Sequence, residues 1–210
     1  MTQQIAEDFT KLIETSEMPA GQKKVLQASV ELFALQGYSA TSTAQIAEAA
    51  GVSQGTIFKY FKNKQALLNF ILDSTIAQLI PSYSMEIMKR LKNEIHTARD
   101  FINFIIDDRY AFLSENRQLV LIVQDQFLTD DAFVKLTKEK LSDRFQFVCQ
   151  TVDDLAGKDF TMPTVDLLQL IASQLLFLFL MEFRFKLPTK FDRKHELNQI
   201  KENVYQAALK

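Results

Sequence analysis

The residues of this chain best suited to chemistry lie in one short stretch in its N-terminal third, and the chemistry they suit is base recognition in duplex DNA. Gln54 can form two hydrogen bonds with adenine, and Lys59 can bind guanine or a phosphate. Phe58 can contact thymine methyl groups, and Gly55 lets the backbone approach the duplex because it lacks a Cβ. We expect a short helix that turns these residues and Thr56 outward into a major groove.

A second group of residues suits the phosphate backbone, because hydroxyl groups, ammonium groups and helix N-termini all bind anions. Tyr60 and Lys64 belong to it, together with the polar residues that begin the two short helices described below. Thr56 and Tyr60 also have a structural alternative, as a helix cap and as a half-buried core residue. The DNA-binding residues predicted from the sequence are Ser42, Thr43, Ser53, Gln54, Gly55, Thr56, Phe58, Lys59, Tyr60 and Lys64.

Two short helices joined by a turn must position these side chains. Ser42 followed by Gln45 is a capping-box pattern that begins a helix over 43–50. Gly51 then permits a tight turn into a second helix over 53–61, which Ser53 can cap. The small core between the two helices is predicted to contain Ile46, Ala47, Val52, Ile57 and Phe61. This order of elements is the helix-turn-helix plan.

The rest of the chain has helical periodicity throughout and no strand signals. Further helices are expected over 22–36, 63–82, 84–93, 97–114, 117–127, 131–156, 163–186 and 192–209. Gly37 can close the first of these by adopting a left-handed conformation. The predicted fold class is all-α: an N-terminal three-helix DNA-binding domain with a helix-turn-helix, followed by a larger helical ligand-binding and dimerisation domain.

The stretch 25–68, VLQASVELFALQGYSATSTAQIAEAAGVSQGTIFKYFKNKQALL, resembles the DNA-binding domain of the TetR (tetracycline-repressor-like) family. The resemblance implies a three-helix head, a helical body that dimerises and often binds an inducer, and usually repression. It places the family's phosphate-contacting tyrosine at Tyr60 and its lysine at Lys64. Where many members have a tyrosine, this chain has Phe58, which lacks the hydroxyl group.

The charge of the chain is distributed unevenly. Residues 21–70 contain five lysines against two glutamates, whereas residues 1–20 contain four acidic residues and one lysine. A local positive charge is what a DNA-binding face requires, even though the formal net charge of the whole chain is -2. We predict an N-terminal helical extension over 1–20, the DNA-binding domain over 21–68 and the regulatory domain over 69–210.

The regulatory domain contains many phenylalanines, which could line an apolar cavity with a few polar groups. The candidate ligand-binding residues are Phe104, Arg109, Gln124, Phe127, Cys149, Gln174 and Phe177. The alternative is that the aromatic residues form an ordinary core and that the glutamines face solvent or a partner. The neighbouring Asp107, Asp108 and Arg109 are expected to form a solvated patch.

A second copy of the chain is the expected partner of the segment 165–185, which is apolar on nearly every side. We predict a homodimer through about 163–209, with the last helix contributing Leu197, Ile200, Val204 and Ala208. The uncharged part of this segment is shorter than the roughly 20 residues of a membrane span. An interface helix is therefore favoured over a membrane helix.

The sequence contains few candidates for catalytic residues. His96 and His195 are expected at exposed positions, and Cys149 has no evident base near it in sequence. No metal-ligand spacing, cofactor motif or secretory signal is expected, so the chain is placed in the cytoplasm. The sequence predicts a DNA-binding transcriptional regulator, in the first instance a repressor released from operator DNA by a small, largely apolar or aromatic effector. The alternative is a DNA-binding regulator or architectural protein whose body binds a protein partner.

Overall fold

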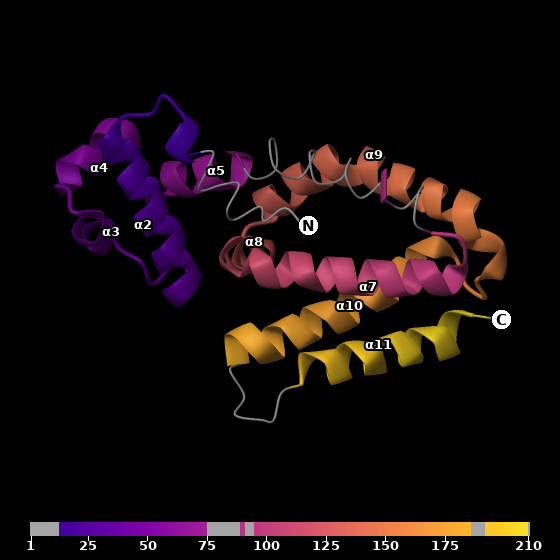
Figure 1. Cartoon of the computed structure of the whole chain (residues 1–210). Coiled ribbons are helices and arrows are strands. Elements are labelled where there is room, and N and C mark those ends of the chain that lie inside the picture. The colour runs from indigo at the N-terminus through magenta and orange to yellow at the C-terminus, as the bar shows by residue number, and fades with distance from the viewer. Residues whose placement is uncertain (1–12, 75–88, 91–94, 186–191, 210) are drawn as a thin grey trace. The chain divides into compact units, whose positions relative to one another are not determined.

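The structure of the chain, a computed structural model, is built from helices (Figure 1). It describes residues 13–74, 89–90, 95–185 and 192–209. The elements are α2 (Ala20–Gln36), α3 (Thr43–Ala50), α4 (Gln54–Tyr60), α5 (Lys64–Ser74), α7 (Ala98–Glu115), α8 (Arg117–Thr129), α9 (Asp131–Ala156), the 3₁₀ turn η2 (Gly157–Asp159), α10 (Thr164–Phe179), the π-helical segment η3 (Leu180–Phe185) and α11 (Arg193–Ala208). Because no strand occurs within these ranges, the predicted all-α fold class is confirmed.

The described helices form two compact units. The first contains α2 to α5, α8 and α9 as far as Lys138, and the second contains α7, the rest of α9, α10, η3 and α11. The domain boundaries predicted after residues 20 and 68 stay predictions. The helix predicted over 84–93 lies outside the described residues except for two helical positions, and so do residues 75–82 and most of the N-terminal extension.

Local capping interactions begin the helices of the first unit as the sequence predicts. Ser42 accepts from the amide of Gln45, whose side chain in turn accepts from the amide of Ser42, so the capping box is complete. Gly51 ends α3 in the left-handed region, with φ 63° and ψ 38°. Gly37 also has a positive φ of 86°, but its ψ of 159° is extended, so the left-handed closure predicted there is wrong.

The helix α2 is the centre of the first unit, because it packs against α3, α4, α5 and α8. Its side chains are therefore buried on more than one face: Val25, Leu26, Ala28, Ser29, Val30 and Phe33. The hydroxyl of Ser29 donates to the carbonyl of Val25 at 2.6 Å, which satisfies a polar group that is fully buried.

In the second unit α10 packs against α11, and α7 belongs to the same unit. The large buried side chains of α7 include Phe101, Ile102, Ile106 and Tyr110. Ile200, Val204 and Ala208 of α11 are 8%, 0% and 0% exposed within the single chain. The prediction that these three residues contact a second copy is therefore wrong, because the apolar stripe of α11 is already covered by its own subunit.

The apolar segment predicted over 163–186 is α-helical only as far as Phe179 and continues as the π-helix η3. Its inner face buries Leu167, Ile171 and Leu175, whereas Phe177 on the outer face is 62% exposed. By length and mean hydropathy (1.8), the 22 residues Thr164–Phe185 could cross a membrane, but a segment of this kind is also found at helix interfaces. Only 33% of its apolar window is buried within the chain.

The segment η3 connects three elements of the second unit through Glu182. This carboxylate accepts hydrogen bonds from the hydroxyl of Tyr110 on α7 and from the guanidinium of Arg193 on α11. Burial raises the pKa of Tyr110, and the hydrogen bond to Glu182 raises it further. Tyr110 therefore remains a neutral donor in this contact.

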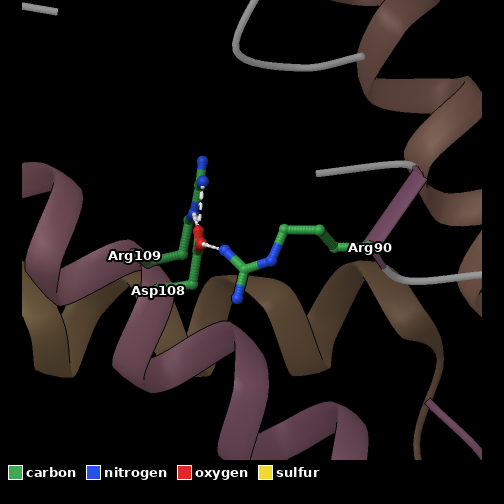
Figure 2. A network of polar contacts seen from close by, with 3 residues as sticks. All are labelled: Arg90, Asp108 and Arg109. Atoms are coloured by element: carbon green, nitrogen blue, oxygen red, sulfur yellow. Dashed lines mark hydrogen bonds and ion pairs between the residues drawn. The ribbon is translucent and has the colours of Figure 1, made fainter. Parts of the chain in front are cut away.

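The predicted solvated patch at 107–109 is only partly correct, because Asp108 is 5% exposed. Its carboxylate accepts from the guanidinium of Arg90 at 2.8 Å and from that of Arg109 at 2.5 Å (Figure 2). Asp107, one residue away, is exposed and pairs with Lys201 at 2.6 Å. Helical periodicity turns neighbouring residues by about 100°, so adjacent aspartates face different surroundings.

Replacement of Asp108 by alanine is expected to lower the free energy of unfolding by about 3 kcal/mol, because two guanidinium groups lose the carboxylate between them. This is the low end for a buried pair, since the Arg90 and Arg109 side chains are 32% and 29% exposed. Urea unfolding followed by circular dichroism measures the change. The matched control is Asp107→Ala, for which we expect a loss below about 1 kcal/mol. Equal losses in the two variants would contradict the buried role of Asp108.

Candidate nucleic-acid interface

The seven-residue helix α4 is held in place by one inner side chain and one cap. Ile57 is 0% exposed, and Phe61, just after the helix, is 4% exposed. The hydroxyl of Ser53 accepts from the amide of Thr56 at 3.2 Å, which closes the N-terminus of the helix. With Ile57 turned inward, the opposite side of α4 is available to a ligand.

That opposite side carries four of the residues predicted to bind DNA. Gln54, Gly55 and Lys59 are exposed, and Phe58 is 49% exposed. The Lys59 ammonium lies 5.6 Å from the centre of the Tyr60 ring, so the ends of these two side chains lie close to each other. An apolar ring, an amide and an ammonium group are thus presented side by side, as direct base readout requires.

Thr56 and Tyr60 lie at the edge of this face and are half-buried. A Cβ built on Gly21 would lie 3.3 Å from the Thr56 methyl group and 3.6 Å from the Tyr60 hydroxyl oxygen. The Thr56 hydroxyl is 3.0 Å from that of Ser53. The structural alternative considered for these two residues therefore describes part of their environment: both contact the start of α2.

The start of α3 adds a second polar edge. Ser42 is exposed and acts as the N-cap, with its amide 2.8 Å from Gln45 Oε1. Thr43, the first residue of the helix, is half-buried. The hydroxyl group of Ser42 is engaged by the cap, so an anion at this edge would meet the amides of the first turn as well as the side chains.

Lys64 is placed differently from the other predicted contacts. Its ammonium donates to the carbonyl of Tyr38 at 2.8 Å and to that of Thr41 at 2.7 Å. It also lies 4.2 Å from the centre of the Tyr38 ring. The sequence contained no signal for this arrangement, because the two carbonyl groups come from a loop more than twenty residues earlier.

The predicted ligand-binding residues of the first unit are Gln124 and Phe127 on α8. The Gln124 Oε1 atom is buried and has no hydrogen-bond partner among the described residues. Phe127 is 45% exposed and contacts the ring of Phe133 edge to face, with 5.2 Å between ring centres. Gln124 therefore has a free acceptor in a buried position, whereas Phe127 is partly at the surface.

The predicted ligand-binding residues of the second unit have separate surroundings. The guanidinium of Arg90 lies 4.6 Å from the centre of the Phe104 ring, and Arg109 donates to the carboxylate of Asp108.

The remaining three residues are on α9 and α10. The side-chain oxygen of Gln174 accepts a hydrogen bond from the amide of Asn203 at 3.3 Å, and the exposed Phe177 lies on the same helix as Gln174. Cys149 is buried, and burial raises the pKa of its thiol, so the reactive thiolate form is disfavoured.

An open groove of about 610 Å³ in the second unit contains none of these seven residues. It is lined by Asp107, Asp192, Arg193, Lys194, Leu197, Asn198 and Lys201. The sequence did not reveal it, because charged residues at helical spacing are typical of an ordinary solvated face. His96 and His195 are exposed, as predicted, and no metal-binding group of three ligands occurs in the described ranges.

The decisive comparison concerns the helix-turn-helix itself. Residues 25–71 match the family described as bacterial regulatory proteins, tetR family. This segment of the chain, which contains the helix-turn-helix, is therefore similar to the tetR family. The match begins inside α2 and ends inside α5, so it includes every residue of α4.

Curated relatives are similar to parts of the chain. The "Fatty acid metabolism regulator protein" of Bacillus subtilis (strain 168) is 29% identical over 101 residues, which is 48% of this chain and 50% of that protein. The "HTH-type transcriptional regulator AcrR" of Shigella flexneri is 40% identical over 62 residues, 28% of this chain and 29% of that protein. The chain thus spans about half the length of these relatives, or less.

Solved structures are similar over most of the chain. The transcriptional regulator FadR from Bacillus subtilis, solved in complex with stearoyl-CoA, has a TM-score of 0.57 at 21% identity and covers 86% of this chain and 96% of its own. NalD, the secondary repressor of the MexAB-OprM multidrug efflux pump in Pseudomonas aeruginosa, has a TM-score of 0.60 at 21% identity over 90% and 96%. At these identities the likeness shows that the fold is shared.

The two glycines of the helix-turn-helix, Gly51 and Gly55, are expected to respond differently to replacement by alanine. Gly51→Ala should lower the free energy of unfolding by about 1 kcal/mol, because a Cβ is strained at φ 63°. Gly55→Ala should leave stability unchanged or raise it by up to about 1 kcal/mol, because the nearest atom to its Cβ would be 3.6 Å away. Urea unfolding distinguishes the two variants.

Titration with duplex DNA gives the second readout for these variants. Gly55→Ala places a methyl group on the exposed side of α4 and is expected to weaken DNA binding although the protein is as stable as the wild type. A Gly55→Ala protein with unchanged stability and unchanged DNA affinity would show that the backbone of α4 does not approach the duplex.

Proposed function

We propose that this chain is a sequence-specific DNA-binding transcriptional regulator in which α4 enters a major groove of operator DNA. The observation that carries the proposal is the division of α4 into a buried Ile57 and an exposed face with Gln54, Phe58 and Lys59. The tetR-family match over 25–71 supports it. In this proposal the residues that face or frame the DNA are Ser42, Thr43, Ser53, Gln54, Gly55, Thr56, Phe58, Lys59, Tyr60 and Lys64.

We assign different tasks to these residues according to their surroundings. Gln54, Phe58 and Lys59 read base edges, and Gly55 brings the backbone of α4 close to the groove. The N-terminus of α3 and the hydroxyl of Tyr60 bind phosphates, which fixes the register of the protein on the duplex. Thr56 holds α4 against the start of α2, since its methyl group faces Gly21.

The regulator acts as a homodimer in this proposal, through the outer face of α10 and the polar side of α11. Val165, Leu176 and Phe177 are 47%, 40% and 62% exposed and lie outside the buried face of α10. Exposed apolar side chains of this size are typical of an interface, and a second copy supplies the same residues. The symmetric pair would present two α4 helices to successive major-groove segments of a near-palindromic site.

Regulation by a small effector is the second part of the proposal. We infer that the protein is a cytoplasmic repressor, released from its operator by a largely apolar molecule bound in the second half of the chain. The similar FadR structure holds stearoyl-CoA, which makes an acyl chain a reasonable class of effector to test. The second candidate is a body that binds a protein partner, which the groove with its mixed charges favours.

The DNA-binding part is tested by operator selection from random duplexes, followed by titration of Lys59→Ala and Tyr60→Phe variants. We expect each variant to bind the selected duplex with a loss of about 1–3 kcal/mol and with unchanged stability, because each loses one direct contact. The matched control is Lys62→Ala, an exposed lysine next to α4, which should bind almost as the wild type does. Wild-type affinity in both test variants would remove α4 from the interface.

The effector part is tested on the protein–operator complex with stearoyl-CoA, a free long-chain fatty acid, and coenzyme A without an acyl chain as the control. We expect an acylated compound to release the DNA and to stabilise the free protein by about 2.7 kcal/mol at one hundred times its Kd. The measurements are fluorescence anisotropy and thermal unfolding. If none of the compounds changes either signal, the acyl effector is wrong and a protein partner becomes the better proposal.

A further inference from the structure

We propose that Gly21 is a positioning residue for DNA reading. Because it has no side chain, α4 lies close against the start of α2, and this contact sets the angle of the exposed face of α4. The inference rests on the proposed DNA-binding function and extends it to a residue outside the segment 25–71 that is similar to the tetR family. The observation behind it is the short distance from position 21 to two side chains of α4.

The backbone conformation of Gly21 does not require a glycine. A positive φ occurs at Gly37 and Gly51 but not at Gly21. Gly21 is the second residue of α2, a helix of 17 residues, and alanine is a better helix former than glycine. The effect of a side chain at position 21 therefore depends on the space around it.

Two side chains of α4 occupy the space beside Gly21. A Cβ at position 21 would lie 3.3 Å from the methyl carbon of Thr56, closer than the optimal separation of two carbon atoms. It would also lie 3.6 Å from both the Cε2 atom and the hydroxyl oxygen of Tyr60. A Cβ at Gly55, by comparison, would meet no atom closer than 3.6 Å.

The methyl group of Thr56 is held in its place facing position 21. The Thr56 hydroxyl lies 3.0 Å from the hydroxyl of Ser53, and the Thr56 amide donates to the same Ser53 oxygen at 3.2 Å. Rotation about χ1 would move the Thr56 hydroxyl away from Ser53 and lose the contact between the two hydroxyl groups. A side chain at position 21 would therefore be accommodated by a shift between the two helices.

Of these two helices, α4 is the less firmly held. The helix α2 also packs against α3, α5 and α8. The segment before α2 contains the buried Ile13, and the ammonium of Lys23 donates to the carbonyl of Glu14 at 2.6 Å. In contrast, α4 has seven residues and depends on tertiary contacts for its stability. A side chain at position 21 would thus move α4, and with it the face that reads the groove.

The test uses Gly21→Ala and Gly21→Val, which place a methyl and an isopropyl group at position 21. The matched control is Ala20→Val, because Ala20 is the exposed neighbour at the first position of α2. Thr56→Ser, which removes the methyl group and keeps the hydroxyl, is made alone and together with Gly21→Ala. Each protein is titrated with the selected operator duplex and with a random duplex at several salt concentrations. Thermal unfolding and the amide chemical shifts of residues 54–60 are measured without DNA.

For Gly21→Ala we expect about fivefold weaker binding to the operator, within the range of coupling between residues in contact, and a larger loss for Gly21→Val. Binding to random DNA should change less, and the slope of affinity against salt concentration should stay at the wild-type value because no charge is removed. The melting temperature of Gly21→Ala should not fall, since alanine favours the helix. In the Thr56→Ser background, Gly21→Ala should have little effect on operator binding, because the closest atom to its Cβ is absent.

Two results would overturn the proposal. One is wild-type operator affinity in Gly21→Val. The other is a loss in Gly21→Ala that is just as large in the Thr56→Ser background, because the loss would then not pass through this contact. If the wild type itself failed to bind duplex DNA, the proposed function would be wrong, and the amide shifts would still decide the role of Gly21. Changes over residues 54–60 in Gly21→Val but not in Ala20→Val would support it, and unchanged shifts in both would exclude it.

Discussion

The interface depends on one constraint: a helix of seven residues does not persist in water without tertiary contacts. The helix α4 meets this constraint with a single fully buried side chain, Ile57, assisted by the cap at Ser53 and by Phe61 at its end. Because Gly21 has no side chain, the start of α2 can lie close to Thr56 and Tyr60 of the same helix. One buried side chain is enough to hold α4 in place because the cap at Ser53 closes its N-terminus and the helices α2 and α3 pack against it.

Because α4 buries only one side chain completely, most of its polar groups lie on its exposed face. Ile57 faces inward and Thr56 and Tyr60 are half-buried, so Gln54, Gly55, Phe58 and Lys59 remain exposed and available for contact with a ligand. The cost is that α4 relies on elements distant in sequence. The helices α2 and α3 both pack against α4, and α2 begins far earlier in the chain, at Ala20.

Sequence reasoning succeeded where the signal is local. The capping box at Ser42 and Gln45, the left-handed Gly51 and the cap at Ser53 each involve residues at most three positions apart, and each is present in the structure. Helix boundaries followed the same local signals, and most agree to within two residues. The inward and outward sides of α4 followed from periodicity, apart from Thr56, whose half-buried position depends on Gly21.

Sequence reasoning failed where the answer depends on contacts between distant segments. Asp108 was expected to be solvated, but it is buried and paired with Arg109 and with Arg90, which lies eighteen residues earlier in the chain. The apolar stripe of α11 was assigned to a second copy, because a single sequence does not show which of two possible surfaces covers it. The hydrogen bonds from Lys64 to the loop before α3 could not be predicted from the sequence for the same reason.

The π-helical segment η3 has a consequence for the kind of genetic change that the chain can tolerate. A π-helix closes each hydrogen bond over one more residue than an α-helix does, so the segment contains a surplus residue relative to α10. Removal of one residue there would allow an ordinary helix to form, and the side chains after the deletion within this helical segment would rotate by about 100°. Glu182 could then no longer serve both Tyr110 and Arg193. Within η3, a substitution that leaves Glu182 in place is therefore a milder change than a deletion.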